Sequence, residues 1–239
     1  MRALPMKCEL LEIEGAFNVR DLGGYAGARG QTRTRRFIRA GSMSSLTGKG
    51  KAQLEALGTR CIVDLRSSIE ATRMPDTVSG TEMILYRQIP MMDYIQSSIT
   101  SGDFTSFPKS MTELYMGILD NSQREIREVF ALLADPAYAT VLFHCTAGKD
   151  RTGIVAMLLL LLAGVSEEDT VEDYCWSDKL IGPMDKSGDL PHYLFESRSQ
   201  TMWDTIGHLR EAYGGAEAYL DKIGVTLQQR SLILDKFFC

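Results

Sequence analysis

The chain has 239 residues and the composition of an ordinary globular protein. Hydrophobic residues make up 44% and charged residues 24%, which excludes the low-hydrophobicity, high-charge pattern of disordered chains. The 26 Lys plus Arg stand against 31 Asp plus Glu, and a net charge of -5 argues against a chain that binds nucleic acid through its overall charge. The length predicts a single domain over residues 1–239.

The cysteines and the apolar segments bear on the compartment. The five cysteines stand far apart without a CxxC pair: Cys8, Cys61, Cys145, Cys175 and Cys239. This pattern argues against a disulfide framework and a zinc site, so we expect a reducing compartment and no metal or other cofactor. The N-terminal residues carry no apolar signal segment, and the longest apolar run, residues 154–165, is too short to cross a bilayer. We therefore expect a cytoplasmic protein without a stable membrane anchor; export without a cleaved signal and the oligomeric state stay open.

Short β-branched runs alternate with longer helical runs along the chain. Runs that end in Gly, Ser or Pro predict strands at residues 36–40, 61–65, 84–89 and 141–145. Apolar residues at helical spacing predict helices over residues 47–57 and 111–133. Two or three smaller helices are expected over residues 202–238, with stops at Gly214 and Gly224. The alternation predicts an α/β fold with a mostly parallel central sheet flanked by helices.

Two segments interrupt this alternation. Residues 91–109 and 182–200 combine Gly, Ser and Pro with aromatic residues, a composition typical of mobile loops. We interpret them as irregular inserts of the single domain or as lid segments that fold over the functional site; the sequence leaves both open.

The segment with the strongest chemical signal is residues 141–162, VLFHCTAGKDRTGIVAMLLLLL. It predicts a buried strand, a turn with Gly148, and an apolar helix that begins near Gly153. Ligands of open α/β sheets bind at the carboxyl ends of strands, which is where the turn lies. Cys145 and Arg151 stand six positions apart in it, and this structural context gives the otherwise weak C-x5-R pattern its meaning.

A loop curled over a helix N-terminus can bind an anion. Its successive backbone N–H groups point inward, and the helix dipole adds partial positive charge. Arg151 can hold two phosphate oxygens with its planar guanidinium, and the same positive field favours the thiolate of Cys145. Attack of this thiolate on phosphorus would give a phosphocysteine that water hydrolyses, without a metal.

The run HCTAGKDRTG resembles the phosphate-binding loop of the protein tyrosine phosphatase superfamily, HCxxGxxR[ST]G. Together with FNVRDLGGY at residues 17–25 and DLRSSIE at residues 64–70, it resembles the bacterial tyrosine phosphatase family that includes the mycobacterial protein tyrosine phosphatase B. The resemblance implies a tyrosine phosphatase-like fold and a phosphorylated protein or phosphoinositide as substrate. It also implies site residues: Cys145 as nucleophile, Arg151 as phosphate clamp, Thr152 as the hydroxyl beside the thiolate, and a backbone cradle of Thr146, Ala147, Gly148, Lys149 and Asp150. Gly153, which follows Thr152, is expected among the substrate-binding residues.

Two residues are candidates for the general acid that protonates the leaving oxygen. Asp64 stands at the carboxyl end of a neighbouring strand, and the family resemblance favours it. Asp150 lies inside the loop beside Arg151, in an arrangement that resembles the myotubularin lipid phosphatases. No WPD sequence occurs that could supply the acid from a separate loop, as it does in other tyrosine phosphatases.

Other residues allow a functional and a structural interpretation. Lys149 could bind a second phosphate, or point to solvent or pair with Asp150. His144 could orient the thiolate or be a core histidine. The turn at residues 18–24 is expected to be structural, with support of the phosphate loop as the alternative. Arg66 and Glu70 are expected to pair on a helical turn, with contact of Arg66 with the substrate as the alternative. The basic cluster is interpreted as a solvated sheet edge and comprises Arg33, Arg35, Arg36 and Arg39.

The leading function is a cysteine-dependent phosphomonoesterase that acts on phosphotyrosine, with dual specificity or phosphoinositide specificity as a broader possibility. The alternatives are a phosphate-binding module without turnover and a rhodanese-like sulfurtransferase. The sulfurtransferase loop lacks the RTG helix start present here. Pocket depth separates phosphotyrosine from phosphoserine, and the sequence does not give that depth.

Overall fold

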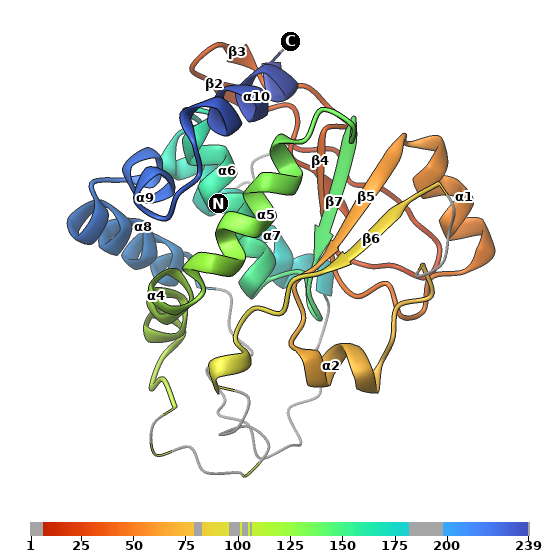
Figure 1. Ribbon diagram of the computed structural model, residues 1–239, viewed down its shortest axis with the longest axis horizontal. Helices are drawn as coiled ribbons and strands as arrows, with labels where there is room; N and C mark the ends of the chain where they lie inside the picture. Colours follow the sequence, from red (N-terminus) through yellow and green to blue (C-terminus); the bar gives the residue numbers. More distant parts are fainter. Residues whose placement is uncertain are drawn as a thin grey trace.

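The computed structural model describes residues 7–78, 83–95, 101, 105, 107–181 and 198–238. Its centre is a five-stranded sheet in the order β1-β4-β7-β5-β6 (Figure 1). The strands are β1 (Arg20–Asp21), β4 (Phe37–Ala40), β7 (Thr140–His144), β5 (Thr59–Asp64) and β6 (Leu85–Gln88). The last four are parallel, and β1 is antiparallel to β4. A separate two-stranded ribbon joins β2 (Ala26–Gly27) to β3 (Gly30–Gln31).

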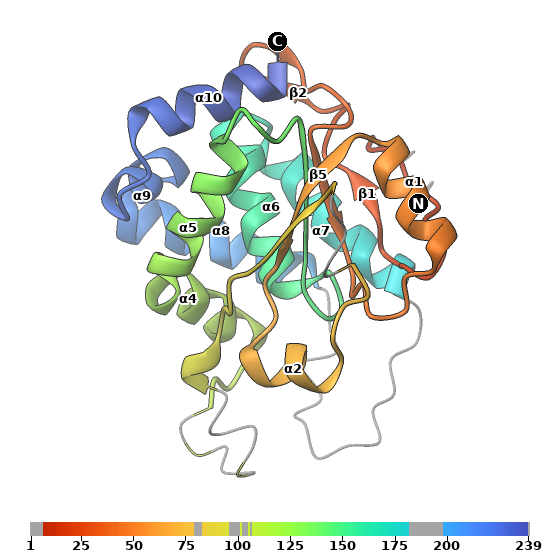
Figure 2. The ribbon, with the colours of Figure 1, turned by 45° about the vertical axis from the view of Figure 1, so that its right-hand side comes forward.

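Helices cover both faces of the sheet (Figure 2). One face carries α1 (Gly48–Ala56), and α2 (Ser68–Arg73) follows β5. The other face carries most of the helices, and a short 3-10 helix, η1 (Asp93–Ile95), precedes them in the chain. These helices are α4 (Met111–Asn121), α5 (Gln123–Ala134), α6 (Asp150–Leu162), α7 (Glu167–Ile181), α8 (Ser199–Tyr213), α9 (Ala216–Lys222) and α10 (Leu227–Phe238).

The alternation of side chains along each strand fills two cores. In β7, Val141 and Phe143 enter the large core under α4 to α10, whereas Leu142 enters the smaller core under α1. Neighbouring strands repeat this pattern, because successive side chains of a strand point to opposite faces. Both faces are therefore buried, which explains why the strands read as continuous apolar runs.

The carboxyl ends of three central strands lie at one edge in register. Ala40, His144 and Asp64 are paired across β4, β7 and β5. The segments that follow these strands therefore leave the sheet side by side. This edge brings the turn after β7 next to the segments after β4 and β5, and it positions the candidate site.

The structure confirms the α/β fold and the four predicted strands, but it corrects one helix. Residues 111–133 form two helices, because Ser122 leaves the helical conformation with φ -108° and ψ 28°. Helix α7 was not predicted, although Ser166 accepts the N–H of Asp169 at its start and acidic residues fill its first turn. Gly214 ends α8 with φ 84°, as expected, and Gly224 follows α9.

Two further expectations concern membrane spans and inserts. No helix in the described part of the chain combines the length and the apolar character that a membrane span needs. Of the two predicted segments, residues 96–100, 102–104 and 106 of the first and residues 182–197 of the second lie outside the described residues.

Candidate active site

The loop between β7 and α6 carries Cys145 through Lys149, and α6 begins at Asp150. Cys145 is buried, with 1% of its surface exposed. Gly148 has φ 68°, and a Cβ at this position would lie 2.3 Å from the carbonyl oxygen of Ala40. Only glycine fits this turn without strain, because the conformation and the close approach both exclude a side chain.

The backbone N–H groups of the loop are open to a ligand. Those of Thr146, Ala147 and Gly148 have no acceptor within the described ranges. Unpaired backbone N–H groups at a buried helix start are an arrangement that binds anions. The structure therefore places a set of donors beside the Cys145 thiol.

Arg151 lies in the first turn of α6 and is held by Glu70 of α2. Its Nη1 and Nη2 atoms donate to the two carboxylate oxygens of Glu70 at 2.5 and 2.8 Å, and Thr146 donates its hydroxyl to the same carboxylate at 2.5 Å. Burial alone would raise the pKa of Glu70, but the Arg151 guanidinium holds this pKa well below its usual range. The Nε atom of Arg151 is buried without a hydrogen-bond partner in the described part of the chain.

The position of Glu70 corrects a sequence prediction. Glu70 does not pair with Arg66. Its side chain returns to the N–H of Ser67 at 2.9 Å in a capping box that starts α2, and from there it reaches Arg151. The capping-box spacing of Ser67 and Glu70 was the available sequence signal, but it does not indicate the long-range partner.

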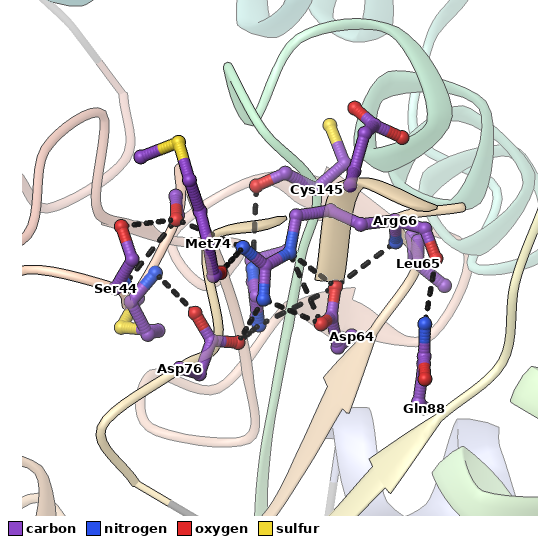
Figure 3. Close-up of polar contacts among 12 residues, drawn as sticks. Ser44, Asp64, Leu65, Arg66, Met74, Asp76, Gln88 and Cys145 are labelled. Atoms are coloured by element: carbon purple, nitrogen blue, oxygen red, sulfur yellow. Dashed lines mark hydrogen bonds and ion pairs between the residues drawn. The ribbon is translucent and has the colours of Figure 1, made fainter. Parts of the chain in front are cut away.

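Asp64 lies in a buried ion network with Arg66 and Asp76 (Figure 3). Its carboxylate accepts the N–H and the guanidinium of Arg66 at 2.7 to 3.0 Å, and the hydroxyl of Tyr86 at 2.7 Å. Burial would raise the pKa of Asp64, but the hydrogen bonds of Arg66 hold it below its usual value. A second carboxylate, Asp76, lies 2.8 Å from Arg66 Nη2 and 3.0 Å from Nε2 of His144.

Three residues of this network are of types that bind metal ions, but the network also contains a cationic side chain that occupies the place of a metal charge. Asp64, Asp76 and His144 could each supply one ligand atom. The Arg66 guanidinium, however, contacts both carboxylates directly and already neutralises charge there. We interpret the cluster as an ion network under the loop, and His144 as its buried histidine.

Asp150 has contacts of a different kind. Its side chain is 24% exposed, and its Oδ1 atom accepts the hydroxyl of Tyr115 at 2.6 Å. Tyr115 contacts the hydroxyl of Tyr174 at 2.9 Å, so two buried phenols stand behind this carboxylate. Lys149 is buried with Nζ 3.5 Å from Asp150, which confirms the pairing and rules out the solvent-facing alternative.

The last two predicted site residues lie in α6. Thr152 is buried, and its hydroxyl has no hydrogen-bond partner in the described part of the chain, the Cys145 thiol included, so its contact with the thiolate stays a prediction. Gly153 faces α7, and a Cβ there would lie 3.4 Å from the ring of Tyr174, an ordinary van der Waals contact.

Comparison with known proteins identifies the family to which the chain is similar. Residues 11–238 match the tyrosine phosphatase family. A tyrosine-protein phosphatase of Nostoc commune is 34% identical over 209 residues, which cover 81% of this chain and 71% of that protein. The triple specificity protein phosphatase PtpB of Mycobacterium tuberculosis is 31% identical over 199 residues, 71% of this chain and 70% of that protein.

A solved structure of P. aeruginosa TpbA in complex with pTyr superposes with a TM-score of 0.49 and 13% identity, and covers 95% of this chain and 100% of that chain. The match over residues 11–238 and the two relatives above 30% identity carry the assignment. This chain belongs to the tyrosine phosphatase family.

Proposed function

We propose that this protein hydrolyses phosphotyrosine through a phosphocysteine intermediate on Cys145. The observation that carries the proposal is the loop at residues 145–151, which combines a buried thiol, N–H groups without acceptors among the described residues and a buried guanidinium. A phosphate dianion complements this set of donors in charge and in hydrogen bonding. Membership of the tyrosine phosphatase family supports phosphotyrosine as the substrate class.

The reaction has two steps. In the first, the Cys145 thiolate attacks phosphorus, the bond between phosphorus and the tyrosyl oxygen breaks, and that oxygen takes a proton from Asp150. In the second, water attacks phosphorus, the sulfur–phosphorus bond breaks, and Asp150 takes the proton from water. The loop N–H groups and Arg151 stabilise the charge that develops on the phosphoryl oxygens.

We propose Asp150 as the general acid in preference to Asp64. An acid must carry its proton when the leaving oxygen needs it, and it must reach that oxygen. Asp64 is fully buried, and Arg66 favours its charged form. Asp150 is partly exposed and adjoins the loop, so it meets the requirement of access.

Lys149 bears on the substrate class. The phosphoinositide interpretation needs a cation that is available to a second phosphate. Lys149 is buried, and Asp150 lies 3.5 Å from its ammonium group, so its charge is already balanced in part. We therefore propose phosphotyrosine as the main substrate and treat dual specificity and phosphoinositide activity as outcomes of the test.

The test is hydrolysis of para-nitrophenyl phosphate in excess chelator by the wild type, Cys145→Ser and Cys175→Ser. Cys175 is a partly buried thiol on α7 without contact to the loop, and it serves as the matched control. We expect turnover in the wild type and in Cys175→Ser, and none in folded Cys145→Ser. Phosphate binding without turnover would favour the non-catalytic module, and transfer of sulfur from thiosulfate without phosphatase activity would favour the sulfurtransferase.

Specificity is measured separately, with phosphotyrosine and phosphoserine peptides and with phosphoinositide vesicles. The proposal predicts the highest kcat/KM for phosphotyrosine. A higher value for phosphoinositides would contradict the substrate assignment and would leave the thiolate mechanism in place.

A further inference from the structure

Four consecutive carbonyl groups of the phosphate loop accept hydrogen bonds from donors outside the loop. The donors come from the segment after β4, from the turn before β1 and from β4 itself. The bonds are Ser42 N–H to Thr146 at 3.0 Å, Asn18 Nδ2 to Ala147 at 3.0 Å and to Gly148 at 3.1 Å, and Arg39 Nη2 to Gly148 at 2.8 Å and to Lys149 at 3.5 Å.

These bonds determine where the loop N–H groups point. In a trans peptide the carbonyl of one residue and the N–H of the next point in opposite directions. The described residues contain no cis peptide. The bonds from Ser42 and Asn18 to the carbonyls of Thr146 and Ala147 therefore direct the N–H groups of Ala147 and Gly148 to the other side, and these two N–H groups have no acceptor in the described part of the chain. Arg39 acts further along the loop, because it holds the carbonyls of Gly148 and Lys149 and so directs the N–H groups of the next residues, Lys149 and Asp150.

The two side-chain donors share a buried anchor. Arg20 donates to the Oδ1 atom of Asn18 at 2.6 Å and to Asp173 at 2.9 Å, and Arg39 donates to the other oxygen of Asp173. Tyr25 adds its hydroxyl to Asp173 at 3.3 Å. Burial would raise the pKa of Asp173, but the two arginines hold it below its usual value. The anchor lies on α7, so one helix fixes both donors.

This arrangement overturns one interpretation of the sequence and favours another. Arg39 is not part of a solvated edge, because its side chain is fully buried. Asn18 contacts the phosphate loop directly, which favours the supporting role of this turn. A buried ion network often adds little net stability, and the loop contacts give this one a role besides stability.

We propose that Asn18 and Arg39 are positioning residues that direct the loop N–H groups at the phosphoryl oxygens, with Asp173 as their common anchor. The proposal rests on the proposed function, since it requires an anion in the loop. It predicts that loss of either donor weakens phosphate binding and transition-state stabilisation together, because the same N–H groups serve both.

The test uses Asn18→Gly and Arg39→Lys, with Arg230→Lys as the matched control. Asn18 has φ 54°, a conformation that glycine adopts easily, so this substitution removes the donor without backbone strain. Arg39→Lys keeps the charge but loses the planar guanidinium. Arg230 is also a buried arginine with a backbone acceptor, Val225, and it lies on α10 away from the loop.

Two quantities are measured. The first is the dissociation constant for inorganic phosphate, by calorimetry, with each substitution in the Cys145→Ser background. The second is kcat/KM for para-nitrophenyl phosphate, with Cys145 intact. We expect both to worsen about tenfold in Asn18→Gly and Arg39→Lys and to stay unchanged in Arg230→Lys, since loop donors act on ground state and transition state alike. A loss of folded protein alone would lower the number of binding sites and leave the dissociation constant unchanged.

The outcomes separate the two proposals. Wild-type phosphate affinity and kcat/KM in folded Asn18→Gly would overturn the positioning role, even if Arg39→Lys fails to fold. Weakened phosphate binding by the variants, with a wild type that does not turn over, would support the positioning role and contradict the proposed function. A Cys145→Ser protein that binds no phosphate would overturn both.

Discussion

Asp150 and Asp64 show how burial assigns different roles to two carboxylates. Asp64 ends strand β5, and Asp150 begins the helix that follows β7. Both are aspartates near the same edge of the sheet, so residue type and position alone did not separate them. Arg66 and Tyr86 surround Asp64, whereas Asp150 is partly exposed and has Tyr115 behind it. The hydrogen bond between Asp64 and Tyr86 spans 22 positions and the one between Asp150 and Tyr115 spans 35, and such distant partners cannot be read from sequence.

The two carboxylates give a paired prediction. Asp150→Asn should lower kcat for phenyl phosphate by about 100-fold or more and affect an aryl phosphate with a good leaving group much less, because only the poor leaving group needs the proton. Asp64→Asn should instead destabilise the fold by about 3 to 5 kcal/mol, because it leaves Arg66 without part of its charge balance in a buried site. Leaving-group series and denaturant titrations measure these effects. A selective loss on phenyl phosphate in Asp64→Asn would contradict the assignment.

Helix α2 positions Glu70 against Arg151. The capping box fixes the start of this short helix, and the same carboxylate that completes the box receives the guanidinium. The Glu70 pKa is lowered in the folded protein, so the ion pair contributes stability above the unfolded pKa of about 4.3 and loses it as pH falls toward the folded value.

The lowered pKa of Glu70 gives a pH prediction for the variant Glu70→Gln. The difference in free energy of unfolding between wild type and variant should be largest at neutral pH. It should shrink as pH falls below about 4.3, because Glu70 of the unfolded wild type then takes up a proton more readily than Glu70 of the folded wild type. Denaturant titrations at several pH values measure it. At neutral pH the variant should also lose kcat/KM, since Arg151 is no longer held. A stability difference that grows on acidification would contradict the ion pair as the cause.

The elements differ in how far the sequence predicts them. Strands β4, β5, β6 and β7 and helix α6 follow from local apolar patterns, because burial on both faces leaves a continuous signal. The break at Ser122 was missed, since serine is tolerated inside helices and a single residue leaves the apolar period intact. The loop and its Cys145 and Arg151 were read from one short motif. Asn18, Arg39 and Asp173 meet only in three dimensions, so their shared function required the structure.

At the scale of the whole molecule, two cores share one sheet. The large core lies under α4 to α10 and the smaller one under α1, and the four parallel strands β4, β5, β6 and β7 contribute to both. We propose that residues 1–239 form a single domain, because both cores are built on the same sheet. Loss of the sheet would therefore disrupt both cores at once. Phosphate binding at the sheet edge should then stabilise the molecule as a unit.

The single-domain proposal predicts one unfolding transition. Both tryptophans, Trp176 and Trp203, lie on the helices of the large core, whereas far-ultraviolet circular dichroism reports on the whole chain. The two signals should therefore give coincident denaturation curves, and both curves should shift to higher denaturant with inorganic phosphate. Separate transitions for fluorescence and circular dichroism would show that the core under α1 unfolds independently.

The central claim is that Cys145 becomes phosphorylated during turnover. The most direct measurement mixes the wild type with an aryl phosphate of good leaving group, quenches the reaction in acid before steady state, and maps phosphorylated peptides by mass spectrometry. The account predicts one phosphoryl group on the peptide that contains Cys145, formed at the rate of the phenol burst and absent in Cys145→Ser. Normal turnover without a phosphorylated Cys145 at any quench time, or turnover that persists in Cys145→Ser, would contradict it.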